Sequence, residues 1–312
     1  MERKPEFIGR RYQPDEKESR QDALRQWSEE ASKPIEGELE KSEEEVRMIE
    51  TVNAIIRGEL ESLGLTDYNP IPPEKVHVLP GEVFKERFPD YSEKAFFRST
   101  SDVVFVNKDK VDTKARMFQT MLHELIHRAS EAKFYADEKT GDIYDARVGY
   151  RIRSPWKGLE REDRLGGFNE MVVDFTAYRI LLKNQQTLES DLGLTKEDIQ
   201  GPIYTYMHYG PILESIVTKI AEDKGIPPVQ VFSDLERGQF ESNILVLKDV
   251  EKSFGKGSLE ALSLLGTLRN EEDNEKLEVM VKDFFAERDE TARQNMVVSI
   301  KEFVRKSQEK SK

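Results

Sequence analysis

The chain has no cysteine among its 312 residues, which excludes disulfide bonds and thiolate metal ligands. It also lacks any apolar run near the roughly 18 residues that a membrane-spanning helix needs. Residues 1–5 are mostly polar, and no apolar stretch of the secretory-signal type follows them. These absences favour a reducing compartment, and we expect a cytoplasmic protein with no membrane partner.

Positive charge is scarce relative to negative charge. The chain has 48 Lys and Arg residues against 61 Asp and Glu residues, which gives a net charge of −13. A nucleic-acid partner requires a basic surface, so this balance argues against nucleic acid as the principal partner. Because single cores seldom grow beyond about 250–300 residues, we expect this chain to fold as two units. The oligomeric state stays open.

Histidine is also rare, with four in the chain, yet His123 and His127 stand four positions apart with Glu124 beside the first. On a helix, positions i and i+4 share one face, so both imidazoles can bind one metal ion. No Pro or Gly interrupts 113–133, and apolar residues recur at helical spacing on the adjacent face: Ala115, Phe118, Leu122, Leu125 and Ala129. This is the HExxH pattern, in which Glu124 is placed to act as general base toward a metal-bound water.

Zinc in a catalytic site takes three protein ligands and keeps one position for water, so a third ligand must come from elsewhere in the chain. The segment 166–174 predicts a helix on which Glu170 and Asp174 share one face. We assign Glu170 as the third ligand and Asp174 as the acceptor of the second ring N–H of His123, with Asn169 as a supporting neighbour. The alternative is an ordinary amphipathic helix with two solvated acids.

The combination of HExxH with Asn-Glu-x-x-x-Asp on a second helix resembles the gluzincin zinc metallopeptidases, the group that contains thermolysin, and in particular their compact intracellular members. The resemblance implies an α+β fold with a small mixed sheet over the HExxH helix, Zn²⁺ held by His123, His127 and Glu170, and hydrolysis of peptide bonds. It covers about 75–220, with motif support at the two helices alone. The interval from position 127 to position 170, 43 residues, is longer than in thermolysin, so subfamily and substrate stay open.

A substrate strand is expected close to the metal helix. The segment 102–106 has the composition of a strand and ends shortly before that helix, where zincins place the edge strand that pairs with an extended substrate. We therefore expect Val103, Val104 and Phe105 to bind substrate, although a plain sheet strand has the same composition. The segments 134–136 and 143–148 predict a hairpin, which would serve as a flap over the cleft.

A gluzincin also needs a donor that stabilises the tetrahedral oxyanion, usually Tyr or His. The segment 204–209 lies downstream of the Glu170 helix, where thermolysin-like enzymes carry such groups. We favour His208 within it as the second catalytic residue beside Glu124. The sequence leaves four tyrosines as alternatives: Tyr150, Tyr204, Tyr206 and Tyr209.

Composition divides the chain into three parts. Residues 1–41 are dense in charge and poor in apolar positions, which predicts a disordered segment that acts as a tether or as a cover for the cleft. Residues 42–225 are expected to form the zincin-like catalytic domain, opened by a helix that a capping box at Ser42 begins and Gly64 ends. Residues 226–312 predict a C-terminal helical domain, with helices at 258–268, 275–286 and 291–304.

The sequence thus favours a zinc-dependent endopeptidase acting on peptide or protein substrates, with a zinc-activated water as nucleophile and Glu124 as general base. A second interpretation keeps the same ligands in a regulatory or inactive zincin that binds zinc and a peptide or protein partner without turnover. A third is a helical protein in which the two histidines pair with surface carboxylates and the motif match is accidental.

Overall fold

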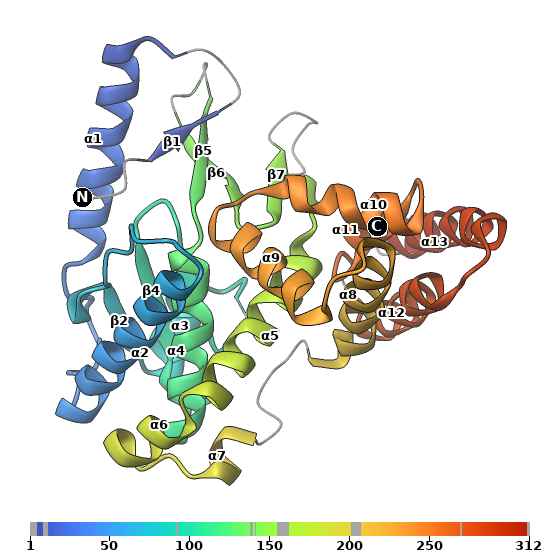
Figure 1. Ribbon diagram of the computed structural model, residues 1–312. Helices are drawn as coiled ribbons and strands as arrows, with labels where there is room; N and C mark the ends of the chain where they lie inside the picture. The colour runs from blue at the N-terminus through green and yellow to red at the C-terminus, as the bar shows by residue number, and fades with distance from the viewer. Residues whose placement is uncertain are drawn as a thin grey trace. The chain divides into compact units, whose positions relative to one another are not determined.

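The computed structural model describes residues 5–8, 12–91, 93–137, 140, 142–154, 162–200, 207–268 and 270–310. Its elements form an α+β fold with two small mixed sheets and a mostly helical C-terminal region (Figure 1). The chain divides into two compact units. Unit 1 comprises Met1–Val148 and Ala177–Ile203, and unit 2 comprises Gly149–Thr176 and Tyr204–Lys312.

These limits differ from the predicted domain boundaries after residues 41 and 225. The N-terminal residues belong to unit 1, and the chain enters unit 2 at Gly149, returns to unit 1 at Ala177 and leaves it again after Ile203. Helix α5 (Gly166–Lys183) therefore contributes residues to both units. A composition profile cannot detect a chain that changes unit in the middle of a helix.

The described strands of unit 1 are β1 (Glu6–Phe7), β2 (Val76–Leu79), β3 (Ala95–Arg98), β4 (Val103–Asn107), β5 (Ala132–Ala136) and β6 (Ile143–Val148). Its helices are α1 (Pro14–Ala31), α2 (Glu43–Ser62), α3 (Gly81–Arg87), α4 (Lys114–Ala129), α6 (Gln185–Leu192) and α7 (Lys196–Gln200), with 3₁₀ turns at Pro73–Lys75 and Lys108–Lys110.

Helix α2 begins and ends where the sequence predicts. The Ser42 hydroxyl accepts the N–H of Glu45 while the Glu45 carboxylate accepts the N–H of Ser42, which forms the capping box. Gly64 follows the helix with a φ of +76°, a conformation that glycine adopts without steric cost. The apolar stripe of α2 is buried and packs against α4.

The sheet next to α4 has the strand order β2-β4-β3. Strand β4 lies in the centre, parallel to β2 on one side and antiparallel to β3 on the other. Helix α4 packs against β3, which puts a small mixed sheet beside the HExxH helix, as predicted. In the described part of the chain, no strand pairs with the outer edge of β3.

The described residues of the N-terminal segment, 5–8 and 12–41, include a strand and a helix where the sequence predicts disorder. Strand β1 pairs in parallel with β5, and β5 pairs antiparallel with β6 to form the predicted hairpin. Phe7 and Leu24 are buried in a small core with Phe134 and Ile143 of that hairpin. Few apolar residues suffice here, because the hairpin supplies most of the surface that buries them.

Unit 2 contains β7 (Arg151–Ser154) and β8 (Glu162–Arg164), which pair antiparallel, and 3₁₀ turns at Met207–Tyr209 and Ile244–Val246. Its helices are α8 (Gly210–Lys224), α9 (Pro228–Phe240), α10 (Leu247–Phe254), α11 (Ser258–Leu264), α12 (Glu271–Ala286) and α13 (Glu290–Lys310). Helices α8, α10, α12 and α13 surround one apolar core that also includes Phe168 and Met171 of α5. The three predicted C-terminal helices correspond to α11, α12 and α13, with ends that differ by up to six residues.

Candidate metal centre

Helix α4 carries both histidines of the motif. Thr113 begins the helix, because its hydroxyl accepts the N–H of Arg116, and twelve of the sixteen helical residues are buried. Glu124 is 8% exposed and His127 is 9% exposed, whereas His123 is half-buried. Burial on nearly all sides fixes the orientation of the helix, so the face that carries the histidines is fixed with it.

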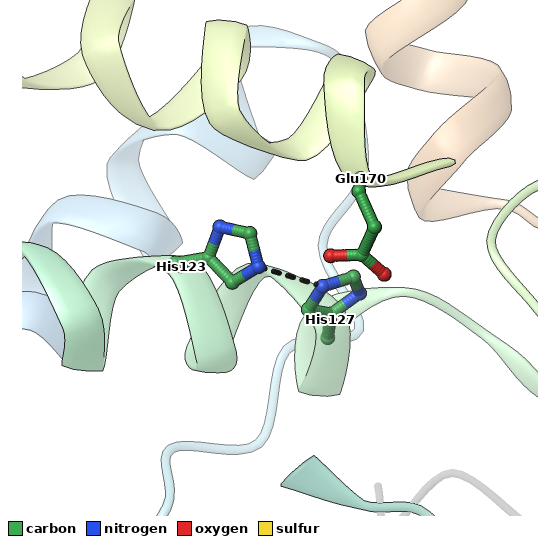
Figure 2. Close-up of side chains that lie close together, drawn as sticks. All are labelled: His123, His127 and Glu170. Carbon is green, nitrogen blue, oxygen red and sulfur yellow. Dashed lines mark hydrogen bonds between the residues drawn. The ribbon is translucent and has the colours of Figure 1, made fainter. Parts of the chain in front are cut away.

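The two imidazoles meet on one face of α4, one turn apart. The Nε2 atoms of His123 and His127 lie 3.0 Å from each other, and the ring centroids lie 4.7 Å apart at an interplanar angle of 68° (Figure 2). Two neutral imidazoles at this distance can share a single proton between the two nitrogens. A cation placed between them would instead accept both lone pairs, which is the arrangement that the i and i+4 spacing predicted.

Glu170 completes the group from α5. One ligand atom from each of His123, His127 and Glu170 lies within 4.8 Å of the other two. Figure 2 shows the Glu170 side chain extending from α5 toward the two rings on α4. No other group of three or more potential ligands meets this criterion among the residues that the structure describes. The predicted set of three ligands is therefore brought together.

The donor set fits zinc. Two imidazole nitrogens and one carboxylate oxygen are a ligand set found in catalytic zinc sites. Tetrahedral coordination with Zn–N bonds near 2.05 Å would separate two nitrogens by about 3.3 Å. The observed separation of 3.0 Å needs only a small outward movement of either ring. A site with three protein ligands also leaves one coordination position for a small molecule.

Glu124 contacts the neighbouring sheet. Its Oε2 atom accepts the backbone N–H of Phe97 at 2.8 Å. In the antiparallel register of β3 and β4, Lys94 pairs with Asn107 through a backbone hydrogen bond, so Ala95 and Phe97 direct their backbone groups away from β4. One carboxylate oxygen of Glu124 is therefore held at the outer edge of β3.

The first turns of α5 are packed tightly within unit 2. A Cβ atom added at Gly167 would lie 2.6 Å from the Leu265 carbonyl oxygen, so this position requires glycine. The Asn169 side chain accepts the backbone N–H groups of Tyr150 and Arg151, at 2.9 and 3.3 Å. Asn169, predicted as a neighbour that supports the ligands, thus fixes a turn of unit 2. Asp174 is fully buried on α5, one turn beyond Glu170.

The last turns of α5 are held within unit 1 by a buried carboxylate. Glu59 of α2 accepts hydrogen bonds from Arg179 at 2.6 Å and from Lys183 at 2.9 Å. Burial alone would raise the pKa of Glu59, but these two cationic donors lower it below its usual value.

The predicted substrate strand does not have the position that this role requires. Val103, Val104 and Phe105 lie in β4, whose two edges are already paired with β2 and β3. A substrate cannot add to a central strand, because its backbone N–H and C=O groups are already used. The edge next to α4 belongs to β3, at Ala95–Arg98.

The residues proposed from the sequence as oxyanion donors differ in burial and in hydrogen-bond partners within unit 2. His208 is half-exposed and pairs with Glu278 of α12 at 3.3 Å, and burial raises the pKa of Glu278. Tyr150 is fully buried, donates to the Leu235 carbonyl at 2.7 Å, and has its pKa raised well above the usual value by burial. Burial and the charge of Glu278 raise the pKa of Tyr209 to about 12. Tyr204 and Tyr206 lie outside the described residues.

Phe97 and Glu59 were not singled out from the sequence. Phe97 acts through a backbone N–H, which every residue except proline carries, so its identity gives no signal. Glu59 is one of several acidic residues of α2, and its partners lie about 120 residues further along the chain. An acidic residue at a position that continues a buried helical stripe was the one available hint.

No protein-family model matches this chain, and comparisons with curated proteins and with solved structures also find no match. The gluzincin resemblance therefore rests on the two motifs and on the His-His-Glu group that they form. Within the described ranges, no helix combines the length and apolar character needed to cross a membrane.

Proposed function

We propose that this chain is a zinc-dependent endopeptidase in which His123, His127 and Glu170 hold the metal and Glu124 is the general base. One observation carries the proposal: three ligand atoms from two motifs, 43 positions apart, converge to within 4.8 Å, with Glu124 beside the first ligand. When bound, zinc would supply a Lewis acid that lowers the pKa of water to about 7 and polarises a carbonyl group.

Glu124 has the chemistry of a general base. Its carboxylate accepts a proton from the attacking water and passes it to the leaving amine, which splits the peptide bond without a covalent enzyme intermediate. The Phe97 N–H donates to Oε2 of this carboxylate at 2.8 Å, which fixes its position next to β3. Glu124 is 8% exposed, so its side chain is largely shielded from bulk water.

The outer edge of β3 suits an extended peptide. The Ala95 N–H and C=O and the Phe97 C=O point outward from β3, and a peptide laid along this edge could pair with them while Glu124 holds the Phe97 N–H. The contact between Phe97 and Glu124 joins this edge to the base, so a peptide bound there would pass beside the carboxylate. In this proposal β3 takes the substrate role that the sequence suggested for Val103–Phe105.

Glu124→Gln is the decisive test, because it keeps the size of the side chain and an oxygen that can accept the Phe97 N–H but removes the base. We expect the variant to keep its zinc and its fold while turnover falls by about 10²–10⁴-fold. Parent and variant, both loaded with zinc, would be incubated with denatured proteins and peptides, and mass spectrometry would map the cleavage sites. Glu50→Gln, an exposed acid on α2, is the matched control.

The other outcomes separate the remaining interpretations. Equal cleavage by parent and Glu124→Gln would indicate a contaminating protease and contradict the proposed base. Zinc at one equivalent with no cleavage by the parent would favour the regulatory zincin, which binds a partner without turnover. Absence of zinc from the parent after addition of the metal would contradict both.

A further inference from the structure

A short segment, Ala31 to Lys41, lies against the sheet β2-β4-β3 and is called the strap below. The Leu39 N–H donates to the Val78 carbonyl of β2 at 3.0 Å, so the strap adds one hydrogen bond along the outer edge of β2. Ala31 and Ile35 pack on the aromatic core that includes Phe84 and Phe105. The strap therefore connects the end of α1 to the edge of the sheet.

Two further contacts of the strap come from His77, a fully buried residue of β2. Its Nδ1 atom lies 2.8 Å from Glu38 Oε2, and its Nε2 atom lies 2.6 Å from the Ala31 carbonyl oxygen. A carboxylate and a carbonyl oxygen can only accept, so both ring nitrogens must donate. This requires the imidazolium form, because neutral imidazole has one N–H.

One anion faces the ring directly, and two cations lie further from it. Glu38 faces Nδ1 directly and also accepts from Lys41 of the strap and from the Ile35 N–H. From the sheet, the His77 ring stacks on Phe105 at 5.2 Å, and the Arg98 guanidinium lies over Phe105 at 5.2 Å.

An ion pair also connects β2 to its neighbours near the strap. The Lys75 ammonium, just before β2, bonds Ser28 of α1 and Asp102, which precedes β4. Burial alone would raise the pKa of Glu38, but the hydrogen bonds from His77, Ile35 and Lys41 hold it at about 2. Glu38 therefore stays negative throughout the range in which histidine side chains change charge.

We propose that His77 is a proton-dependent clasp, which holds the strap on β2 while its ring is charged and releases it when the ring loses a proton. Neutral His77 keeps one N–H, so it can satisfy either Glu38 or Ala31 but not both. The other contact then sets a nitrogen lone pair against an oxygen at 2.8 or 2.6 Å, which is repulsive. The clasp uses no residue of the metal centre and is independent of the proposed activity.

The chain has no cysteine, so a single introduced cysteine can carry a spin label at one defined position. A nitroxide label on Glu36→Cys, an exposed strap residue, would report the mobility of the strap by electron paramagnetic resonance. We expect the label to become more mobile as the pH rises from about 5.5 to about 8.5, the range in which histidine titrates. In the His77→Gln background, the label should be mobile at both ends of the range, since Gln donates from one group alone. In the His208→Gln background, the step should persist.

Two results would overturn the clasp: a line shape in the parent that does not change with pH, or a pH step that survives in His77→Gln. If His77→Gln fails to fold, nuclear magnetic resonance of ¹⁵N-labelled histidine in the parent decides. Variants of the other three histidines then assign the His77 signal by elimination. Both His77 nitrogens should carry protons at about pH 6, and a neutral ring at that pH would contradict the proposal.

Discussion

The histidines of unit 1 lie in two opposite environments. His77 is enclosed by acceptors, with a carboxylate at one ring nitrogen and a carbonyl at the other. His123 and His127 instead face each other through their Nε2 atoms, and a third donor, Glu170, completes the group. The surroundings of His77 require a proton on both ring nitrogens. The His123, His127 and Glu170 group instead places the lone pairs of three ligand atoms around one position.

This difference teaches that burial alone does not tell what a histidine does. Hydrogen-bond acceptors on both sides of an imidazole favour its protonated form, which can hold a segment in place. Two imidazoles and a carboxylate whose lone pairs point to a common position can instead bind a metal cation. Polar partners decide between these roles, and each role predicts a different loss on substitution. His77 should affect the strap and not the metal, and the α4 histidines should do the reverse.

Removing a metal ligand is expected to have the largest effect. His127→Ala leaves one imidazole and one carboxylate, too few ligands to hold zinc, and His123→Ala and Glu170→Ala should behave alike. Metal analysis of the zinc-loaded, purified proteins would measure one equivalent in the parent and essentially none in each variant. His77→Gln is the matched control. It removes a buried imidazole from the sheet next to α4 but should leave the zinc content unchanged.

The outcomes of this comparison are distinct. Full zinc in Glu170→Ala alone would transfer the third position to another acid, such as Glu162 or Asp163 of β8. Full zinc in all three ligand variants would contradict the metal centre itself. Loss of zinc in His77→Gln would mean that the two environments are linked.

A smaller effect is expected from Asp174→Asn. If the buried carboxylate accepts the second ring N–H of His123, its loss should weaken zinc binding by about 10–100-fold without abolishing it. Competition with a chelator of known affinity would measure the change. Asp191→Asn, an exposed acid on α6, serves as the control, and equal affinities in the two variants would exclude a role for Asp174.

The smallest effect is expected from protonation of Glu38 at acid pH, which should loosen the strap. Its pKa is lowered from 4.5 to about 2, so its ionised form stabilises the strap above pH 4.5, and this contribution disappears as the pH falls toward 2. The label at position 36 should therefore gain mobility for a second time in acid. Glu38→Gln should remove this acid step, and a strap that tightens in acid would contradict the assignment.

The parts of the fold that follow from local patterns were predicted well. The stripe and capping box of α2, the glycine that follows it and the HExxH helix α4 depend on residues a few positions apart, which the sequence displays directly. The ligand set also followed from local spacing, because each motif needs one helix face. The resemblance to gluzincins rests on these residues alone, because no family model matches the chain.

The predictions that differ from the structure share a physical cause. The order of strands in a sheet, and burial by residues far away in the sequence, depend on the whole chain. Val103–Phe105 has the composition of any buried strand, and its place in the centre of the sheet depends on β2 and β3. The segment 1–41 has too few apolar residues to fold alone, yet Phe7 and Leu24 find a surface on the β5–β6 hairpin. No local pattern reveals a partner more than 100 residues away.

The contact between Glu124 and Phe97 has a consequence for solubility. A sheet edge that points its N–H groups outward invites another copy of the chain to add a strand, and proteins limit this with charged groups at the edge. Here a carboxylate occupies one of the outward N–H groups of β3. Any substitution of Glu124 that removes the acceptor, such as alanine, would open this edge to self-association, whereas glutamine would keep it covered.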